Sequence, residues 1–123
     1  MRLSVNLKGQ YRPSKLVRCE LLGTSHMTQP SFQEFESAAH AQGYVEVIVR
    51  EWAPLTVLDT HSHPFDAKAL VVSGELWLTV GHGADKQTQH ITAGQRFELA
   101  RDIPHDERYG ADGTTVWVGR RSS

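Results

Sequence analysis

The sequence has a single cysteine, Cys19, among its 123 residues. One cysteine cannot form an internal disulfide or a cysteine-ligated zinc cluster, and it fits a reducing compartment, which favours the cytoplasm. No apolar run approaches the ~20 residues that a membrane-spanning helix needs. A GxGxxG motif, a glycine loop for phosphate and a Ser-His-Asp or Cys-His arrangement are also lacking. These absences argue against a membrane protein, a phosphate-binding loop and a serine or cysteine nucleophile.

Strong net charge is lacking as well, because 13 basic and 14 acidic residues give −1 at pH 7. Residues 1–26 carry five of the basic residues and one acidic residue, whereas residues 27–123 carry eight basic and thirteen acidic ones. This acidic main body argues against nucleic-acid binding. The junction Ser25-His26-Met27 resembles the point where a vector-encoded leader meets a start codon. We therefore predict that residues 1–26 are a non-native leader or a loose N-terminal arm and that residues 27–123 form the domain.

After the leader, the sequence predicts one helix followed only by strands. Ser31 and Glu34 form a capping box at the start of the helix, and Gly43 ends it. Beyond Gly43, short stretches of alternating apolar and polar residues are separated by glycine-containing turns such as Ser73-Gly74. This spacing is typical of an all-β sandwich or closed barrel. A chain of this length, with 39% apolar residues, is expected to form one domain around one core.

Two histidines one residue apart, His61 and His63, lie in this strand-like part of the chain. Side chains at positions i and i+2 of a strand leave the same face, so two imidazoles there can grip a metal ion. A usable site needs about three protein ligands, and His105, which follows Pro104, is the candidate for the third. The other histidines are weaker candidates: His26 in the leader, His40 on the predicted helix, His82 in a glycine loop and His90 on a strand.

The segment from residue 55 to residue 109 resembles a small single-domain cupin. The first cupin motif is commonly written G-x5-H-x-H-x3,4-E-x6-G, and His61, His63 and Gly74 match it. The second is commonly G-x5-P-x-G-x2-H-x3-N, and Gly94 and His105 match it in spacing. The chain departs from these motifs at Leu55, Ala100, Asp102 and Tyr109, and at the acidic ligand position, which falls on Ala67 or Lys68. The resemblance implies a cupin-type double-stranded β-helix, or jelly-roll barrel, with a short N-terminal helix.

The resemblance also implies one divalent metal ion, for which we expect His61, His63 and His105 as ligands. Imidazole suits several ions, so Fe, Zn, Ni, Mn and Cu all stay candidates. Because Ala67 cannot supply the usual carboxylate, Asp66 is a candidate fourth ligand if Pro64 breaks the strand register, and a solvated loop acid otherwise. The alternative to a metal site is a set of histidines that serve only as polar lining.

We therefore expect a metal-binding cupin that acts as a small metal-dependent oxygenase or isomerase on a small polar molecule. The alternative is a non-catalytic module that binds or senses a small ligand, because the fold does not decide between the two. Residues 45–52 are a long apolar candidate edge strand, which predicts a homodimer. We expect Trp77 and Trp117 to pack in the core or an interface, and Arg50 and Glu98 to lie on the surface. Next to His105, one of Asp106, Glu107 and Arg108 either orients its imidazole or belongs to a solvated turn.

Overall fold

The computed structural model describes residues 29–81 and 83–122, so the predicted leader lies outside the described residues. One helix precedes eight strands in this part of the chain: α1 (Phe32–Ala41), β1 (Glu46–Trp52), β2 (Val57–His61), β3 (Asp66–Ser73), β4 (Glu75–Val80), β5 (Gln87–Thr92), β6 (Arg96–Leu99), β7 (His105–Tyr109) and β8 (Thr114–Arg121). A short 3-10 helix, Gly83–Asp85, follows β4.

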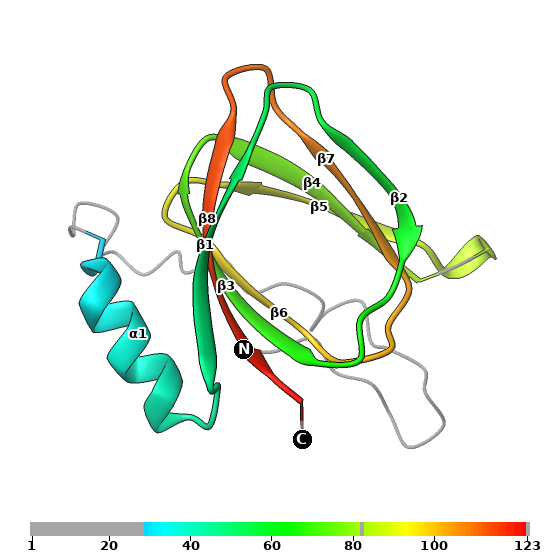
Figure 1. The fold of residues 1–123 in the computed structure, drawn as a ribbon. Coiled ribbons are helices and arrows are strands. Elements are labelled where there is room, and N and C mark those ends of the chain that lie inside the picture. Colours follow the sequence, from blue (N-terminus) through cyan, green and yellow to red (C-terminus); the bar gives the residue numbers. More distant parts are fainter. Residues whose placement is uncertain (1–28, 82, 123) are drawn as a thin grey trace.

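The strands pair as two antiparallel sheets of four strands, in the orders β1-β8-β3-β6 and β2-β7-β4-β5. The two sheets face one another, and the apolar core lies between them (Figure 1). Two facing four-stranded sheets built from strands far apart in the sequence are the arrangement of a jelly roll. The predicted all-β fold with a short N-terminal helix is thereby confirmed.

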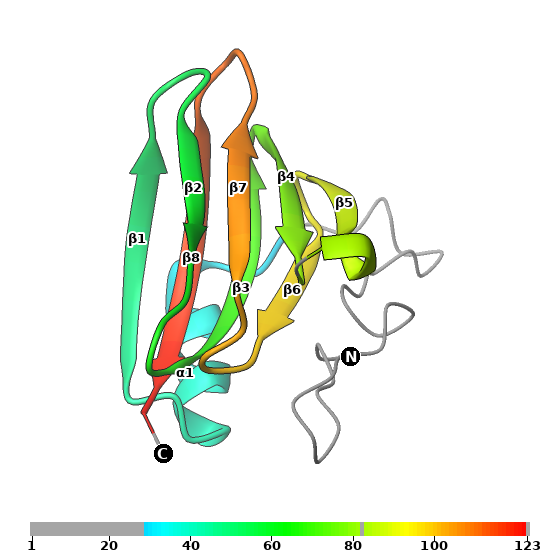
Figure 2. The same cartoon turned by 90° about the vertical axis from the view of Figure 1, so that its right-hand side faces the viewer.

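Helix α1 covers the outer face of the β1-β8-β3-β6 sheet, behind the strands when the molecule is turned as in Figure 2. Ser31 and Glu34 form the predicted capping box. The ring centroids of Phe32 and Phe35 lie 5.4 and 5.8 Å from that of Trp117 on β8. Trp117 is therefore a packing residue between helix and sheet, as the sequence predicted, and the inner face of the sheet is left for the core.

Two residues at positions where the cupin motifs have glycine keep a glycine-like backbone. Leu55 has φ 60° and Asp102 has φ 64°, and they are the non-glycine residues with positive φ among the described ones. The left-handed region costs an L-residue other than glycine roughly 1–2 kcal/mol. The fold therefore retains the backbone that the motif requires although the glycines are gone, which supports the alignment of both motifs with this chain.

We predict that Leu55→Gly raises the free energy of unfolding by ~0.5–1 kcal/mol. Leu55 is 69% exposed, so little burial is lost, and glycine removes the steric strain of the left-handed backbone. Val57→Gly is the matched control, because Val57 is 61% exposed but lies in strand β2. That change should lower the free energy of unfolding by a similar amount. Urea unfolding measures both, and equal losses in the two variants would contradict the prediction.

Candidate metal centre and ligand cavity

The structure brings the three predicted histidines together at one end of the space between the sheets. His61 ends β2, His105 begins β7 directly opposite it in the register, and His63 lies in the loop after β2. Their ring centroids are 4.3 to 4.9 Å apart. The ligand nitrogens all lie within 4.8 Å of one another, so the group could hold a metal ion.

Backbone hydrogen bonds fix which nitrogen of two of these rings is free. Nδ1 of His61 lies 2.6 Å from the carbonyl oxygen of Asp59, and Nδ1 of His105 lies 2.9 Å from that of Ile103. A carbonyl oxygen can only accept, so each Nδ1 carries the proton and donates it. Each Nε2 then points toward Glu107 in the cluster, which is the arrangement of a metal-ligating histidine whose other nitrogen is anchored.

His63 is held as a neutral imidazole by its surroundings. Its ring stacks on Phe65, with centroids 4.7 Å apart and planes inclined by 6°. Burial, followed by the neighbouring rings of His105 and His61, lowers the pKa of His63 to about 4. At neutral pH this ring is therefore uncharged and has a lone pair to donate, as metal ligation requires.

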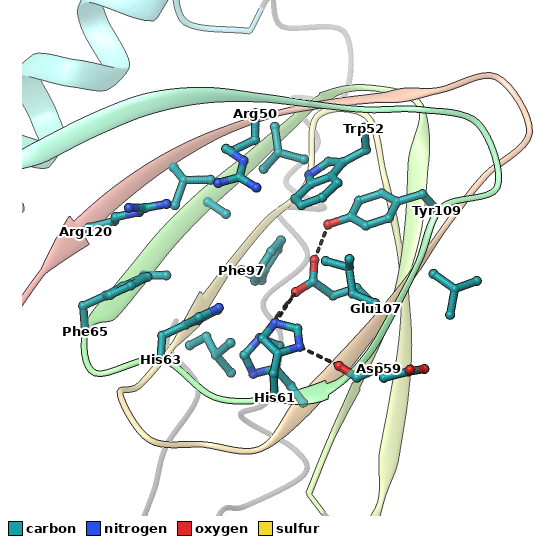
Figure 3. A pocket seen from close by; sticks show the side chains of 18 residues that line it. Arg50, Trp52, Asp59, His61, His63, Phe65, Phe97, Glu107, Tyr109 and Arg120 are labelled. Carbon is teal, nitrogen blue, oxygen red and sulfur yellow. Dashed lines mark hydrogen bonds and ion pairs between the residues drawn. The ribbon is translucent and has the colours of Figure 1, made fainter.

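Glu107 supplies a carboxylate to the histidine cluster. Its Oε2 lies 3.3 Å from Nε2 of His105 and 3.6 Å from Nε2 of His61, and its other oxygen accepts a hydrogen bond from the Tyr109 hydroxyl (Figure 3). Burial alone would raise the pKa of this carboxyl, but His105, the Tyr109 hydroxyl and His61 hold it below its ordinary value. Glu107 is therefore an anion at neutral pH. It points inward because it is two residues after His105 on the same strand.

Asp66, the acid weighed from the sequence as a fourth ligand, is engaged elsewhere. Its carboxylate lies 3.2 Å from guanidinium nitrogens of both Arg101 and Arg121, and it accepts a 2.8 Å hydrogen bond from the Arg101 backbone N–H. Burial opposes ionisation of Asp66, but these bonds from Arg101 and Arg121 hold its pKa below the ordinary value. The group that could hold an ion consists of the three histidines and includes neither Asp66 nor Glu107.

The histidines open onto a cavity of about 490 Å³ between the two sheets. Ala67, at the motif position of the usual carboxylate, and Ala69 line it from β3, and their small side chains leave room. The rest of the wall is largely apolar and includes Phe97, Leu99, Val116 and Val118. A cavity of this size, apolar with a few convergent polar groups, is typical of a small-molecule site.

The sheet that faces β2 and β7 adds aromatic and cationic side chains to the cavity. Trp52 stacks on Tyr109 with centroids 4.9 Å apart, and Arg50 lies over Trp52 at 4.6 Å (Figure 3). Arg120 lines the same cavity from β8. The prediction of a surface position was therefore wrong for Arg50, because alternation along β1 turns Ile48, Arg50 and Trp52 away from solvent. Glu98 does not line this cavity.

Other candidates from the sequence lie away from the cavity. His90 is half exposed on β5, where its ring stacks on Trp77 at 4.5 Å and its Nε2 lies 2.8 Å from Glu75. His40 is exposed near the end of α1 and bonds the backbone of Tyr44. Both are surface residues, as predicted, while His26 and His82 lie outside the described residues. Trp77 packs on the outer face of its sheet.

The donor set of this site fits a divalent metal ion. The three histidines present nitrogens within 4.8 Å of one another, and the Glu107 oxygen lies beside them, 3.3 and 3.6 Å from the His105 and His61 nitrogens. Nε2 of His105 is buried and has no hydrogen-bond partner in the described part of the chain. The Glu107 oxygen faces it at 3.3 Å, and two acceptor atoms at that distance need a proton or a cation between them.

No family model matches this sequence, and no curated protein matches it. Solved structures do match, each at a TM-score of 0.54 or 0.55. The cupin domain of Drosophila melanogaster CENP-C is 14% identical over 62% of this chain and 60% of that chain. A structure of the DMSP lyases RdDddP and RnDddQII is 23% identical over 61% of this chain and 37% of that one, and a variant of Bacillus subtilis oxalate decarboxylase is 13% identical over 61% of this chain and 20% of that one. The matched region thus spans about 60% or less of these neighbours.

These likenesses, with the two facing sheets, show that the chain has the cupin fold, as the motif resemblance predicted. The neighbours include enzymes named for a reaction and a CENP-C domain bound to CAL1. The fold therefore does not determine the activity, which has to be inferred from the residues of the site. Among the described residues, no helix has the length and apolar character needed to cross a membrane.

Proposed function

We propose that this chain is a metal-dependent cupin that holds one divalent ion at His61, His63 and His105. The observation that carries the proposal is the buried, unpartnered Nε2 of His105, which faces the Glu107 carboxylate at 3.3 Å. Three imidazoles with a carboxylate beside them suit Fe, Zn, Ni, Mn and Cu. With Glu107 as a fourth ligand, the set would have the three histidines and one acid of the usual cupin site, and the acid would come from β7 in place of β3.

We propose further that the ion, when bound, serves as a Lewis acid or redox centre for oxygenation or isomerisation of a small polar molecule. The protein contributes a cavity with largely apolar walls around the bound molecule. Tyr109 is held by its stack on Trp52 and by its hydrogen bond to Glu107. The hydrogen bond from Tyr109 fixes the orientation of the Glu107 carboxylate beside the histidines.

The proposal is tested by the metal content of protein purified without added metal. We expect about one divalent ion per chain, removable by a chelator and restored by one of the candidate metals, as measured by inductively coupled plasma mass spectrometry. The metal should also raise the melting temperature, because it binds the folded state only. Protein that neither retains a metal nor gains stability from any of the five would contradict the proposal. Oxygen uptake in the presence of a substrate would separate the enzyme from a non-catalytic binding module.

We also propose that the protein is a cytoplasmic homodimer that pairs through β1. This strand is at the edge of its sheet, and its neighbourhood exposes Val45 at 76% and Val49 at 47%. Exposed apolar edges are commonly covered in natural proteins. Sedimentation velocity at micromolar concentration should show a dimer that Val49→Lys weakens, and a monomer in the unchanged protein would contradict this proposal.

A further inference from the structure

The cavity wall opposite the histidines carries two cationic side chains, Arg50 and Arg120. They come from β1 and β8, which are neighbours in the sheet that faces β2 and β7. Figure 3 shows both side chains directed into the cavity. Arg120 lies four residues beyond Val116, the register partner of Arg50, so the two side chains reach the cavity from two points along this wall.

Aromatic rings support both guanidinium groups. Arg50 lies 4.6 Å from the centroid of Trp52, and Arg120 lies 4.8 Å from the centroid of Phe65. A guanidinium over an aromatic face keeps its N–H groups free to donate in its own plane. The aromatic rings thus position the two cations but do not satisfy their hydrogen-bond donors.

The described residues leave much of this positive charge without an acidic partner. No hydrogen bond or ion pair joins the Arg50 guanidinium to a residue that the structure describes. Arg120 has a contact of 3.3 Å to Glu46, which is 55% exposed, but its Nε is buried without a hydrogen-bond partner. The Glu107 carboxylate, the acid of the same cavity, lies beside His105 and His61 rather than beside the arginines. A partly buried guanidinium with unused donors favours an anion as its partner.

We infer that the cavity binds a small organic carboxylate, with the carboxylate held by Arg50 and Arg120 and the other end of the molecule at the histidine cluster. The inference rests on the proposed function and names its substrate class. A carboxylate matches the planar fork of a guanidinium with two parallel hydrogen bonds. The apolar walls between the arginines and the histidines then suit the hydrocarbon part of the ligand.

The experiment uses hydroxamates, which chelate protein-bound divalent metals, with and without a carboxylate at the far end. The probes are the monohydroxamates of succinate, glutarate and adipate, each compared with the neutral hydroxamate of equal carbon number (butyro-, pentano- and hexanohydroxamate). We expect the best-fitting carboxylate probe to bind the metal-loaded protein at least ~10-fold more tightly than its neutral control, as one charge-assisted hydrogen bond allows. Isothermal titration calorimetry measures the dissociation constants.

The variants Arg50→Met, Arg120→Met and the double variant should lose this preference while keeping the metal and the affinity for the neutral probes. Arg108→Met is the matched control, because Arg108 also lies over a tryptophan, Trp77 at 4.8 Å, but on the outer face of its sheet. It should keep the full preference. If a variant does not fold, the inference is still tested by whether the unchanged protein binds the carboxylate probes more tightly than the neutral ones.

Equal binding of the charged and neutral probes by metal-loaded protein would overturn the carboxylate inference alone. A preference that survives in the double arginine variant would overturn it too, because another group would then hold the carboxylate. Protein that binds neither metal nor any hydroxamate would overturn the proposed function and this inference with it. The metal measurement thus separates the two failures.

Discussion

Replacing His61 with alanine should leave the purified protein without a tightly bound metal ion. His61 presents its Nε2 to the cluster, 3.6 Å from Glu107, because its Nδ1 is fixed by the Asp59 carbonyl. Losing a residue that only supports a ligand costs ~10–100-fold in metal affinity, so losing a ligand should cost more than ~100-fold. The side chain is 32% exposed, and its removal should therefore leave the core intact.

His90→Ala is the control for this experiment. His90 is a histidine of similar exposure, 46%, but it pairs with Glu75 on the outer face of the sheet. That variant should retain about one metal ion per chain. Metal analysis after identical purification compares the two, and unfolding in urea checks that each variant is folded. Full metal occupancy in folded His61→Ala protein would remove His61 from the ligand set.

The histidine cluster could be predicted from the sequence because its geometry follows from local rules. His61 and His63 are separated by one residue, and the motif spacing from Gly94 to His105 places the third histidine near them. Both steps use spacing along the chain and need no knowledge of how the side chains pack. The structure pairs His61 with His105 in the register of β2 and β7.

The remaining groups of the cavity were missed or misplaced because they depend on which face of a strand is buried. The sequence alone does not distinguish Glu107 from Asp106 and Arg108 as a partner of His105, although its position two residues after His105 indicates the same face. The sequence shows the alternation in β1 but not which face is inner, so it does not reveal that Arg50 faces the cavity. The partners of Asp66, Arg101 and Arg121, could not be found from spacing, because they lie 35 and 55 residues away in the sequence.

Replacing Glu107 with glutamine should lower metal affinity by more than ~100-fold if Glu107 is the fourth ligand. Glutamine keeps the volume of the side chain, and its amide oxygen can still accept the hydrogen bond from the Tyr109 hydroxyl. What it removes is the negative charge that faces His105 at 3.3 Å and His61 at 3.6 Å. An amide oxygen is a far weaker ligand for these ions than a carboxylate, and the charge of a bound ion would be left less compensated.

Two further variants distinguish a ligand from a residue that only orients the histidines. Tyr109→Phe removes the hydroxyl that holds Glu107 and leaves its charge, so metal affinity should fall by no more than ~10–100-fold, as for a supporting residue. Asp66→Asn removes the other candidate acid, which is paired with Arg101 and Arg121. It should leave metal affinity unchanged and affect stability alone.

Competition with a chromophoric chelator gives the metal dissociation constants of all three proteins. The order of affinity expected is Asp66→Asn above Tyr109→Phe, and both above Glu107→Gln. Unchanged metal affinity in Glu107→Gln would show that the site has three histidine ligands. Glu107 would then serve only to accept hydrogen bonds from the imidazoles and to orient them. Loss of the metal from Asp66→Asn, with Glu107→Gln unaffected, would assign the fourth position to Asp66 and would require β3 to move when the metal binds, because Asp66 is now held by two arginines on the far side of its strand from Ala67.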